Sequence, residues 1–248
     1  MCAYYVSLFA SLRRLVGSIR FAIIFTVSLF QGPITSLRFS KKANSLVSGS
    51  DDGMIAIWRI KDWECVSFKP AHKGSVTDLD VHPSGKVMIS CGRDNNVRLW
   101  DMTTSKELYS RSTKGRGYGG FQQLRWRPRG EGFCYALGND VSICDTEGDE
   151  PVVRFAHPRP PFSFAYLSEH TVATGGEDKI VRVWDVRTGK VATQLPEFSS
   201  RIRSLVAESN SKSLTILGCF VCPVLIHAYT QLQSPHPPVV LLPLSLLS

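Results

Sequence analysis

The sequence predicts an all-β fold built from repeated four-stranded blades, a β-propeller, and three observations support this. Trp58, Trp100 and Trp184 each have an aspartate six residues earlier and a hydroxyl residue ten residues earlier. The spacings between these tryptophans are 42 and 84 residues, so one further unit fits between the last two. Short apolar runs alternate with turn-forming Gly, Pro, Asp and Asn. A period of roughly 40 to 45 residues with four strands per unit is typical of WD repeats.

The most complete unit, residues 72–101, sets the pattern for the others. Three strands are expected after its loop histidine, starting at Val76, Val87 and Val97. They are divided by a Pro-Ser-Gly turn at 83–85 and an Arg-Asp-Asn-Asn turn at 93–96. Asp101 closes the unit.

The remaining units depart from this pattern in different ways. The first begins at Gly32 and has Phe30 where the loop histidine is expected. The third is degraded, with a Pro-Arg-Gly turn after Trp126 and Cys144 in place of the repeat tryptophan. The fourth is complete, and after Leu205 the pattern fades. We therefore expect about four recognisable blades, which is part of a seven-bladed propeller, since seven blades need about 290 residues.

A set of polar residues recurs in the blades and is predicted to be hydrogen-bonded inside them. Buried polar groups need partners, and a loop His, a strand Ser or Thr, a turn Asp and the Trp indole can satisfy one another. The same residue types also form nucleophilic triads. Because the set repeats at a fixed period, we interpret it as structural, and we expect no catalytic residue, cofactor or metal. The network residues are Ser48, Asp52 and Trp58, then His72, Ser90, Asp94 and Trp100, and finally His157, Thr174, Asp178 and Trp184.

The composition is that of an ordinary globular protein with a basic surface. Hydrophobic residues make up 43% and charged residues 20%, and the net charge is +8. This charge favours acidic partners such as nucleic acid or an anionic protein surface. Seven cysteines, an odd number in mostly strand-like runs, indicate reduced thiols. Cys219 and Cys222 form a lone C-x-x-C pair without a second pair, which is weak evidence for a metal.

Residues 111–130 interleave basic and aromatic side chains. Cations beside aromatic rings suit RNA phosphates and stacked bases. The alternative is a flexible loop followed by a strand with solvated arginines. The candidate RNA contacts are Lys114, Arg116, Tyr118, Arg125, Arg127 and Arg129.

The two ends of the chain do not follow the repeat, so we expect three regions. Residues 1–31 form a hydrophobic segment whose run from Phe21 to Phe30 has the length of a signal-peptide core, which leaves secretion or a membrane anchor open. Residues 32–212 contain the blades. Residues 213–248 have no Asp, Glu, Lys or Arg and are rich in Leu and Pro, so we expect a disordered or non-native tail, such as a translated intron.

Residues 51–86 resemble the corresponding repeat of the PAK-interacting WD-repeat proteins. The resemblance is carried by the step 63–65 (Trp-Glu-Cys), by 71–74 (Ala-His-Lys-Gly) and by 82–86 (His-Pro-Ser-Gly-Lys). It extends over roughly residues 33–205. The family has further blades on both sides and a lysine-rich tail, which this sequence lacks.

This resemblance implies a seven-bladed, non-catalytic scaffold in the nucleus and nucleolus, needed for large ribosomal subunit assembly. The implied partners are pre-ribosomal proteins and rRNA. A second implied role is an adaptor that binds and restrains p21-activated kinase, and a third reading of the sequence is a membrane-tethered propeller. We expect no small-molecule substrate.

Overall fold

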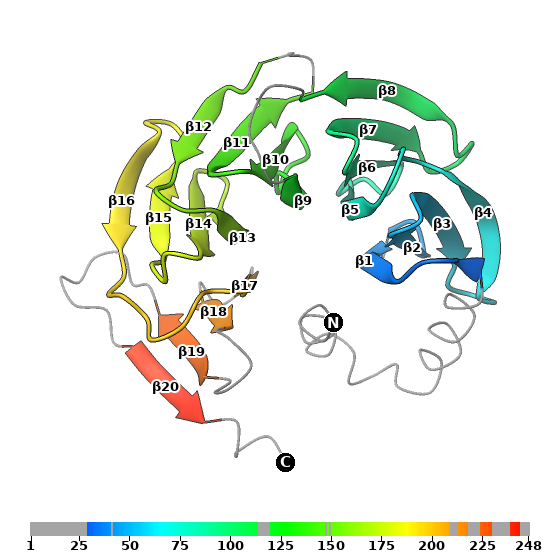
Figure 1. Cartoon of the computed structure of the whole chain (residues 1–248). Helices are drawn as coiled ribbons and strands as arrows, with labels where there is room; N and C mark the ends of the chain where they lie inside the picture. The colour runs from blue at the N-terminus through cyan, green and yellow to red at the C-terminus, as the bar shows by residue number, and fades with distance from the viewer. Residues whose placement is uncertain are drawn as a thin grey trace. The chain divides into compact units, whose positions relative to one another are not determined.

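The computed structural model describes residues 29–40, 42–113, 120–146, 148, 150–208, 213–217, 224–229 and 239–243. Within these ranges twenty strands form five four-stranded sheets (Figure 1). The chain divides into two compact units, one of residues 1–138 and 144–150 and the other of residues 139–143 and 151–248.

The first unit contains two complete blades, each a meander of antiparallel strands in sequence order. The first sheet consists of β1 (Ile34–Ser40), β2 (Ser45–Ser50), β3 (Met54–Arg59) and β4 (Glu64–Pro70). The second consists of β5 (Val76–Val81), β6 (Val87–Gly92), β7 (Asn96–Asp101) and β8 (Glu107–Ser112). Figure 1 shows β1 and β5 at the inner edges of these sheets, with β4 and β8 at the outer edges.

The third sheet is the degraded repeat of the sequence. It contains β9 (Phe121–Trp126), β10 (Gly132–Leu137), β11 (Asp140–Asp145) and β12 (Val153–Ala156). Strands β9 and β10 pair in the first unit, and the boundary between the two units passes through β11. The blade therefore forms although Cys144 replaces the repeat tryptophan.

The second unit contains two further sheets. One consists of β13 (Pro161–Ser168), β14 (Thr171–Gly176), β15 (Arg182–Asp185) and β16 (Lys190–Gln194). The other consists of β17 (Ser204–Glu208), β18 (Ser213–Leu217), β19 (Val224–Tyr229) and β20 (Val239–Pro243). Three strands of this last sheet fall within 213–248, where the sequence showed no strand period. The expected boundaries at 31 and 212 stay a prediction.

The burial of the strands explains why the sequence of each repeat contains short apolar runs. The middle strands have neighbouring strands on both sides and pack on both faces, so β10 is buried at every residue. The outer strand β4 instead alternates between exposed and half-buried residues. Within the first unit one apolar cluster joins the first two sheets through Val47, Leu79 and Met88, and a second surrounds Leu124 on β9.

The turn after β2 holds the loop that carries His72. Gly53 adopts φ +83°, and a Cβ there would lie 2.4 Å from the carbonyl oxygen of His72. Its own carbonyl oxygen accepts hydrogen bonds from the backbone N–H groups of Ala71 and His72. The turn of one blade thus positions the histidine of the next.

Candidate functional site

The complete network of the second blade is present in the structure as a buried chain of hydrogen bonds. His72 Nδ1 lies 2.8 Å from Asp94 Oδ1, and its Nε2 lies 2.8 Å from Ser90 Oγ. The indole Nε1 of Trp100 donates to the same Ser90 oxygen at 2.9 Å. Asp94 also accepts from the backbone N–H of Lys73. The four residues predicted to form this set are therefore in contact.

The directions of these bonds define what the network can do. Burial lowers the pKa of His72 and outweighs Asp94, which acts in the opposite direction. The lowered pKa favours the neutral imidazole at neutral pH. Its Nδ1–H then donates to Asp94, and its Nε2 accepts from the Ser90 hydroxyl. This order matches a Ser-His-Asp triad. However, Ser90 is fully buried and its oxygen already accepts from Trp100, so a substrate has no access to it.

The first blade keeps only part of the set. Trp58 Nε1 donates to Ser48 Oγ at 2.9 Å, while Asp52 accepts from the backbone N–H groups of Gln31 and Met54. Phe30 occupies the position of the loop histidine and is buried against the Trp58 cluster. An apolar ring thus fills the space of the imidazole, and Asp52 binds backbone donors instead.

The polar residues of the fourth repeat form different hydrogen bonds from those of the second. His157 Nε2 lies 2.8 Å from Thr174 Oγ1, which also accepts from Trp184 Nε1 at 2.8 Å. His157 Nδ1, however, lies 3.0 Å from the carbonyl oxygen of Phe155, and Asp178 forms an ion pair with Arg182. The predicted set is therefore split, with His157 bonded to Thr174 and to the Phe155 carbonyl, and Asp178 paired with Arg182.

Two differences between the repeats accompany this split. In the second blade the residue after the histidine, Lys73, donates its backbone N–H to Asp94 and so draws the loop toward the carboxylate. The corresponding residue in the fourth repeat is Pro158, which has no N–H. The spacing from histidine to hydroxyl is also one residue shorter, 17 against 18.

We expect the fold to lose stability on mild acidification. Burial lowers the pKa of both His72 and His157 below the ordinary value. The unfolded chain then binds more protons as the pH falls through about 6.5, so stability decreases from there down to the folded-state pKa values. Urea unfolding at pH 7.5 and 5.5 measures this loss. The loss should be smaller in His157→Gln, and equal stability of the wild type at both pH values would contradict the expectation.

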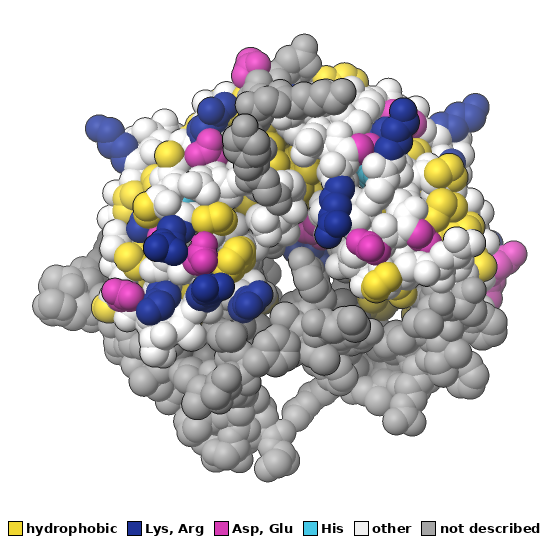
Figure 2. Space-filling view, viewed as in Figure 1, with side chains coloured by type: hydrophobic (Ala, Val, Ile, Leu, Met, Phe, Trp, Pro, Cys, Tyr) yellow, Lys and Arg dark blue, Asp and Glu magenta, His cyan; other side chains and the backbone are white. Residues whose placement is uncertain are grey.

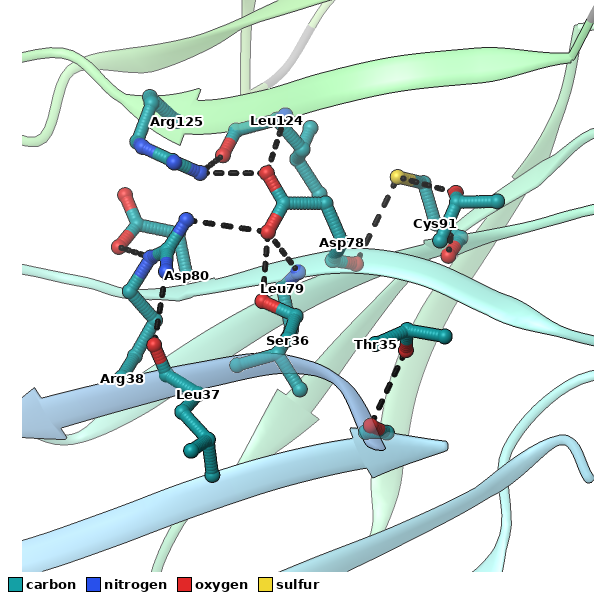
Figure 3. Close-up of polar contacts among 12 residues, drawn as sticks. Thr35, Ser36, Leu37, Arg38, Asp78, Leu79, Asp80, Cys91, Leu124 and Arg125 are labelled. Atoms are coloured by element: carbon teal, nitrogen blue, oxygen red, sulfur yellow. Dashed lines mark hydrogen bonds and ion pairs between the residues drawn. The ribbon is translucent and has the colours of Figure 1, made fainter. Parts of the chain in front are cut away.

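A second polar cluster joins the inner strands of the first unit (Figure 3). Asp78 on β5 is almost fully buried, and both its carboxylate oxygens are engaged. Oδ1 accepts from Ser36 Oγ at 2.6 Å and from Arg38 Nη2 at 3.0 Å. Oδ2 accepts from the backbone N–H of Leu124 at 3.0 Å and from Arg125 Nη1. One carboxylate thus connects β1, β5 and β9.

Asp80 extends this cluster by one row along β5. Its Oδ2 accepts from the backbone N–H of Trp126 at 2.8 Å, and its Oδ1 lies 3.7 Å from Arg38 Nε. Burial raises the pKa of Asp80. For Asp78, burial acts in the same direction, but Arg125 and Arg38 outweigh it and lower the pKa. The pair therefore shares two guanidinium groups, and Asp78 holds its charge more firmly.

The sequence reasoning did not identify this inner-strand cluster. A signal was available, because Arg38, Asp80 and Arg125 follow one another at spacings of 42 and 45 residues, close to the repeat period. Charges of alternating sign at equivalent positions of successive blades predict ion pairs between neighbouring inner strands. In the second unit Ser163 stands at the position of Asp78, and its Oγ accepts from the backbone N–H of Leu205 at 3.0 Å.

The candidate RNA contacts are only partly described by the structure. Arg125 is paired with Asp78, and Arg127 Nη1 lies 3.5 Å from Asp145. Arg129 is exposed on the turn after β9. Lys114, Arg116 and Tyr118 lie outside the described residues. On the face in Figure 2, Lys and Arg side chains are interspersed with Asp and Glu. RNA binding stays a prediction.

Neither a metal-binding cluster nor a membrane-spanning helix is found in the described ranges. Among the described residues no group of three or more His, Cys, Asp or Glu is placed to hold a metal ion. The same part of the chain contains no helix long and apolar enough to cross a membrane. Cys91, Cys134 and Cys144 are buried cysteines, and burial raises the pKa of the Cys91 thiol far above its usual range. The pair Cys219 and Cys222 lies outside the described residues.

Comparison with known families and solved structures identifies the repeat. The model of the family "WD domain, G-beta repeat" matches residues 24–59, 63–101 and 150–185. Among solved structures, the β-propeller domain of Cps50 (Swd1) from Myceliophteria thermophila superimposes with a TM-score of 0.70 at 19% identity, over 87% of this chain and 72% of that one. The predicted WD-repeat propeller fold is thereby confirmed.

Curated relatives match a large part of the chain. The proteins named p21-activated protein kinase-interacting protein 1-like are 28% identical in Xenopus laevis and 30% in Gallus gallus, each over 174 residues. These alignments cover 70% of this chain, and 47% and 46% of the respective relatives. The chain thus spans about half the length of the curated relatives that it matches.

Proposed function

We propose, from its similarity to the p21-activated protein kinase-interacting protein 1-like WD-repeat proteins, that this chain is a non-catalytic scaffold in large ribosomal subunit assembly. In this role it binds pre-ribosomal proteins and rRNA in the nucleolus and supports pre-rRNA maturation. The general part, a WD-repeat protein that binds other proteins, agrees with the family and the fold. The ribosomal part rests on the family resemblance and on the net charge of +8.

One structural observation supports a scaffold over an enzyme. The only complete His-Ser-Asp set among the described residues, that of His72, is buried and fully engaged in hydrogen bonds within its blade. Its groups stabilise the fold, so binding depends on loops and blade surfaces. Since these polar groups are engaged in the fold, the proposed role is binding of protein partners through the surface.

A second candidate function has its own support. The names of the curated relatives state an interaction with p21-activated protein kinase. We propose as the alternative that the chain is an adaptor that binds such a kinase and lowers its activity. Protein binding by a blade surface serves both functions, so the two differ in the partner and in the cellular compartment.

We expect the protein to sediment with precursors of the large ribosomal subunit. Nuclear extract is fractionated on a sucrose gradient, with and without RNase, and blotted with an antibody against residues 72–101. Comigration with pre-ribosomal particles that collapses after RNase treatment supports the scaffold. Signal confined to light fractions, together with capture by a p21-activated kinase regulatory region, contradicts the scaffold and supports the adaptor.

A further inference from the structure

The turn after β14 in the second unit lies against the segments that precede β13 and β17, because backbone hydrogen bonds join it to both. Glu177 on this turn pairs with one arginine from each segment. Its Oε1 lies 3.5 Å from Arg201 Nη2 and 3.9 Å from Arg159 Nη1, and both arginine side chains are exposed. In Figure 2, Lys and Arg side chains gather around Asp and Glu over this part of the second unit.

A third arginine lies beside this pair and contacts an aromatic ring. The Cζ atom of Arg203 lies 5.7 Å from the centroid of the Phe162 ring, which is a cation–π contact. Arg203 is exposed and Phe162 is half-buried, so the ring supports a guanidinium group that solvent can reach. We call this group of residues the Arg203 surface, and its members are Arg159, Phe162, Glu177, Arg201 and Arg203.

The Arg203 surface carries an excess of positive charge. Its three arginines share one carboxylate, that of Glu177, and Arg203 forms no ion pair within the described ranges. Lys179, on the same turn, pairs with Glu197 at 3.6 Å, so these two charges cancel. Residues 213–248 contain no Asp or Glu, so that segment supplies no acidic side chain. The surface therefore favours an anionic ligand.

Two kinds of anionic macromolecule are compatible with this charge, an acidic peptide and a nucleic acid. The carboxylates of a peptide would accept from the arginines but would make no use of the Phe162 ring. A single-stranded nucleic acid uses both features, because its phosphates accept from guanidinium groups and its unpaired bases stack on aromatic rings and on arginine planes. The contact between Arg203 and Phe162 thus favours the single strand.

We propose that the Arg203 surface binds single-stranded RNA, with one base stacked on Arg203 and the adjoining phosphate bound by Arg201 and Arg159. The choice of RNA rests on the proposed scaffold function, while the stacking and the phosphate contacts rest on the surface itself. Glu177 limits the affinity, because it holds two of the arginines. This surface is separate from the candidate RNA contacts in residues 111–130, which belong to the first unit as far as the structure describes them.

The test titrates the purified full chain into a fluorescein-labelled oligouridylate and follows the fluorescence anisotropy. We expect Arg203→Gln to weaken binding about tenfold, the effect of losing one stacked base. Arg203→Lys keeps the charge but loses the guanidinium plane, so it should also weaken binding several-fold. Arg187→Gln is the matched control, because it removes the same charge from an exposed arginine at the opposite end of β15, and it should leave binding nearly unchanged.

A change of the opposite sign tests the role of Glu177. Glu177→Gln keeps the shape of the side chain and releases Arg159 and Arg201 for phosphates. We expect binding several-fold tighter than that of the wild type, with a steeper decrease of affinity as salt is raised. Asp185→Asn, which removes one negative charge beside Arg187, is its control and should have little effect.

Several results would overturn the proposal. Equal losses in Arg203→Gln and Arg187→Gln would mean that only net charge matters. A loss confined to Arg129→Gln would place RNA binding in residues 111–130 instead. Equal affinity for duplex RNA, or displacement of the oligouridylate by polyglutamate of equal charge, would remove the role of base stacking and assign the surface to an acidic protein.

The result is independent of the proposed scaffold function, because the titration uses no ribosomal particle. Arg203→Gln that still sediments with precursors of the large subunit, in a chain that does not bind oligouridylate, would overturn this inference alone. Binding of oligouridylate through Arg203 by a chain that never sediments with those precursors would overturn the scaffold function alone.

Discussion

Asp78→Ala is expected to lower the free energy of unfolding by about 3–5 kcal/mol, the cost of removing one partner from a buried ion pair. The carboxylate is almost fully buried between Arg38 and Arg125 and also accepts from Ser36 and from the backbone of Leu124. Its loss leaves the backbone N–H of Leu124 without its acceptor and leaves Asp80 as the remaining carboxylate for the two guanidinium groups. Urea unfolding of the full chain, followed by tryptophan fluorescence, measures the effect.

Two variants make this result specific. Asp62→Ala removes a carboxylate that also binds an arginine, Arg59, but both side chains are more than 40% exposed, so we expect little change. Asp78→Asn keeps the shape of the side chain and removes its charge, and it should fall between the wild type and Asp78→Ala. A midpoint for Asp78→Ala that equals that of Asp62→Ala would show that the inner strands are held by apolar packing alone.

The sequence was sufficient for the blade network because the residues that form it recur at fixed offsets. The spacing of ten from Ser90 to Trp100 is repeated by Ser48 with Trp58, and in both cases the indole donates to the hydroxyl. Such a contact is local to one hairpin, so the offset determines it. Element type and blade order follow from the same period.

Contacts that depend on a loop were less predictable. Asp178 and Asp94 stand at the same offset from their tryptophans, and each pairs with the arginine four residues later. Asp94 also accepts from the backbone N–H of Lys73, a donor that Pro158 cannot supply in the fourth repeat. The inner-strand cluster was missed for a different reason. Asp78 and Arg125 are 47 residues apart, and only the register between neighbouring blades decides that they meet.

Ser90→Ala is the second substitution with a large expected effect. The Ser90 hydroxyl donates to His72 Nε2 and accepts from Trp100 Nε1, at distances of 2.8 and 2.9 Å. Alanine leaves both ring nitrogens buried without a partner, at a cost of about 1–3 kcal/mol for each unsatisfied group. We therefore expect a total loss of about 2–4 kcal/mol in urea unfolding, because the two costs overlap within one network.

The fourth repeat provides the control for this prediction. Thr174 makes the same two contacts there, so Ser90→Thr should keep the hydrogen bonds and lose less stability than Ser90→Ala, although its extra methyl group enters a fully buried site. The double variant Ser90→Ala/Trp100→Phe removes one unpaired donor and should be less destabilised than the sum of its single changes. If the two changes in the free energy of unfolding are strictly additive, the hydroxyl and the indole act independently. The hydrogen bond between them would then contribute nothing to stability.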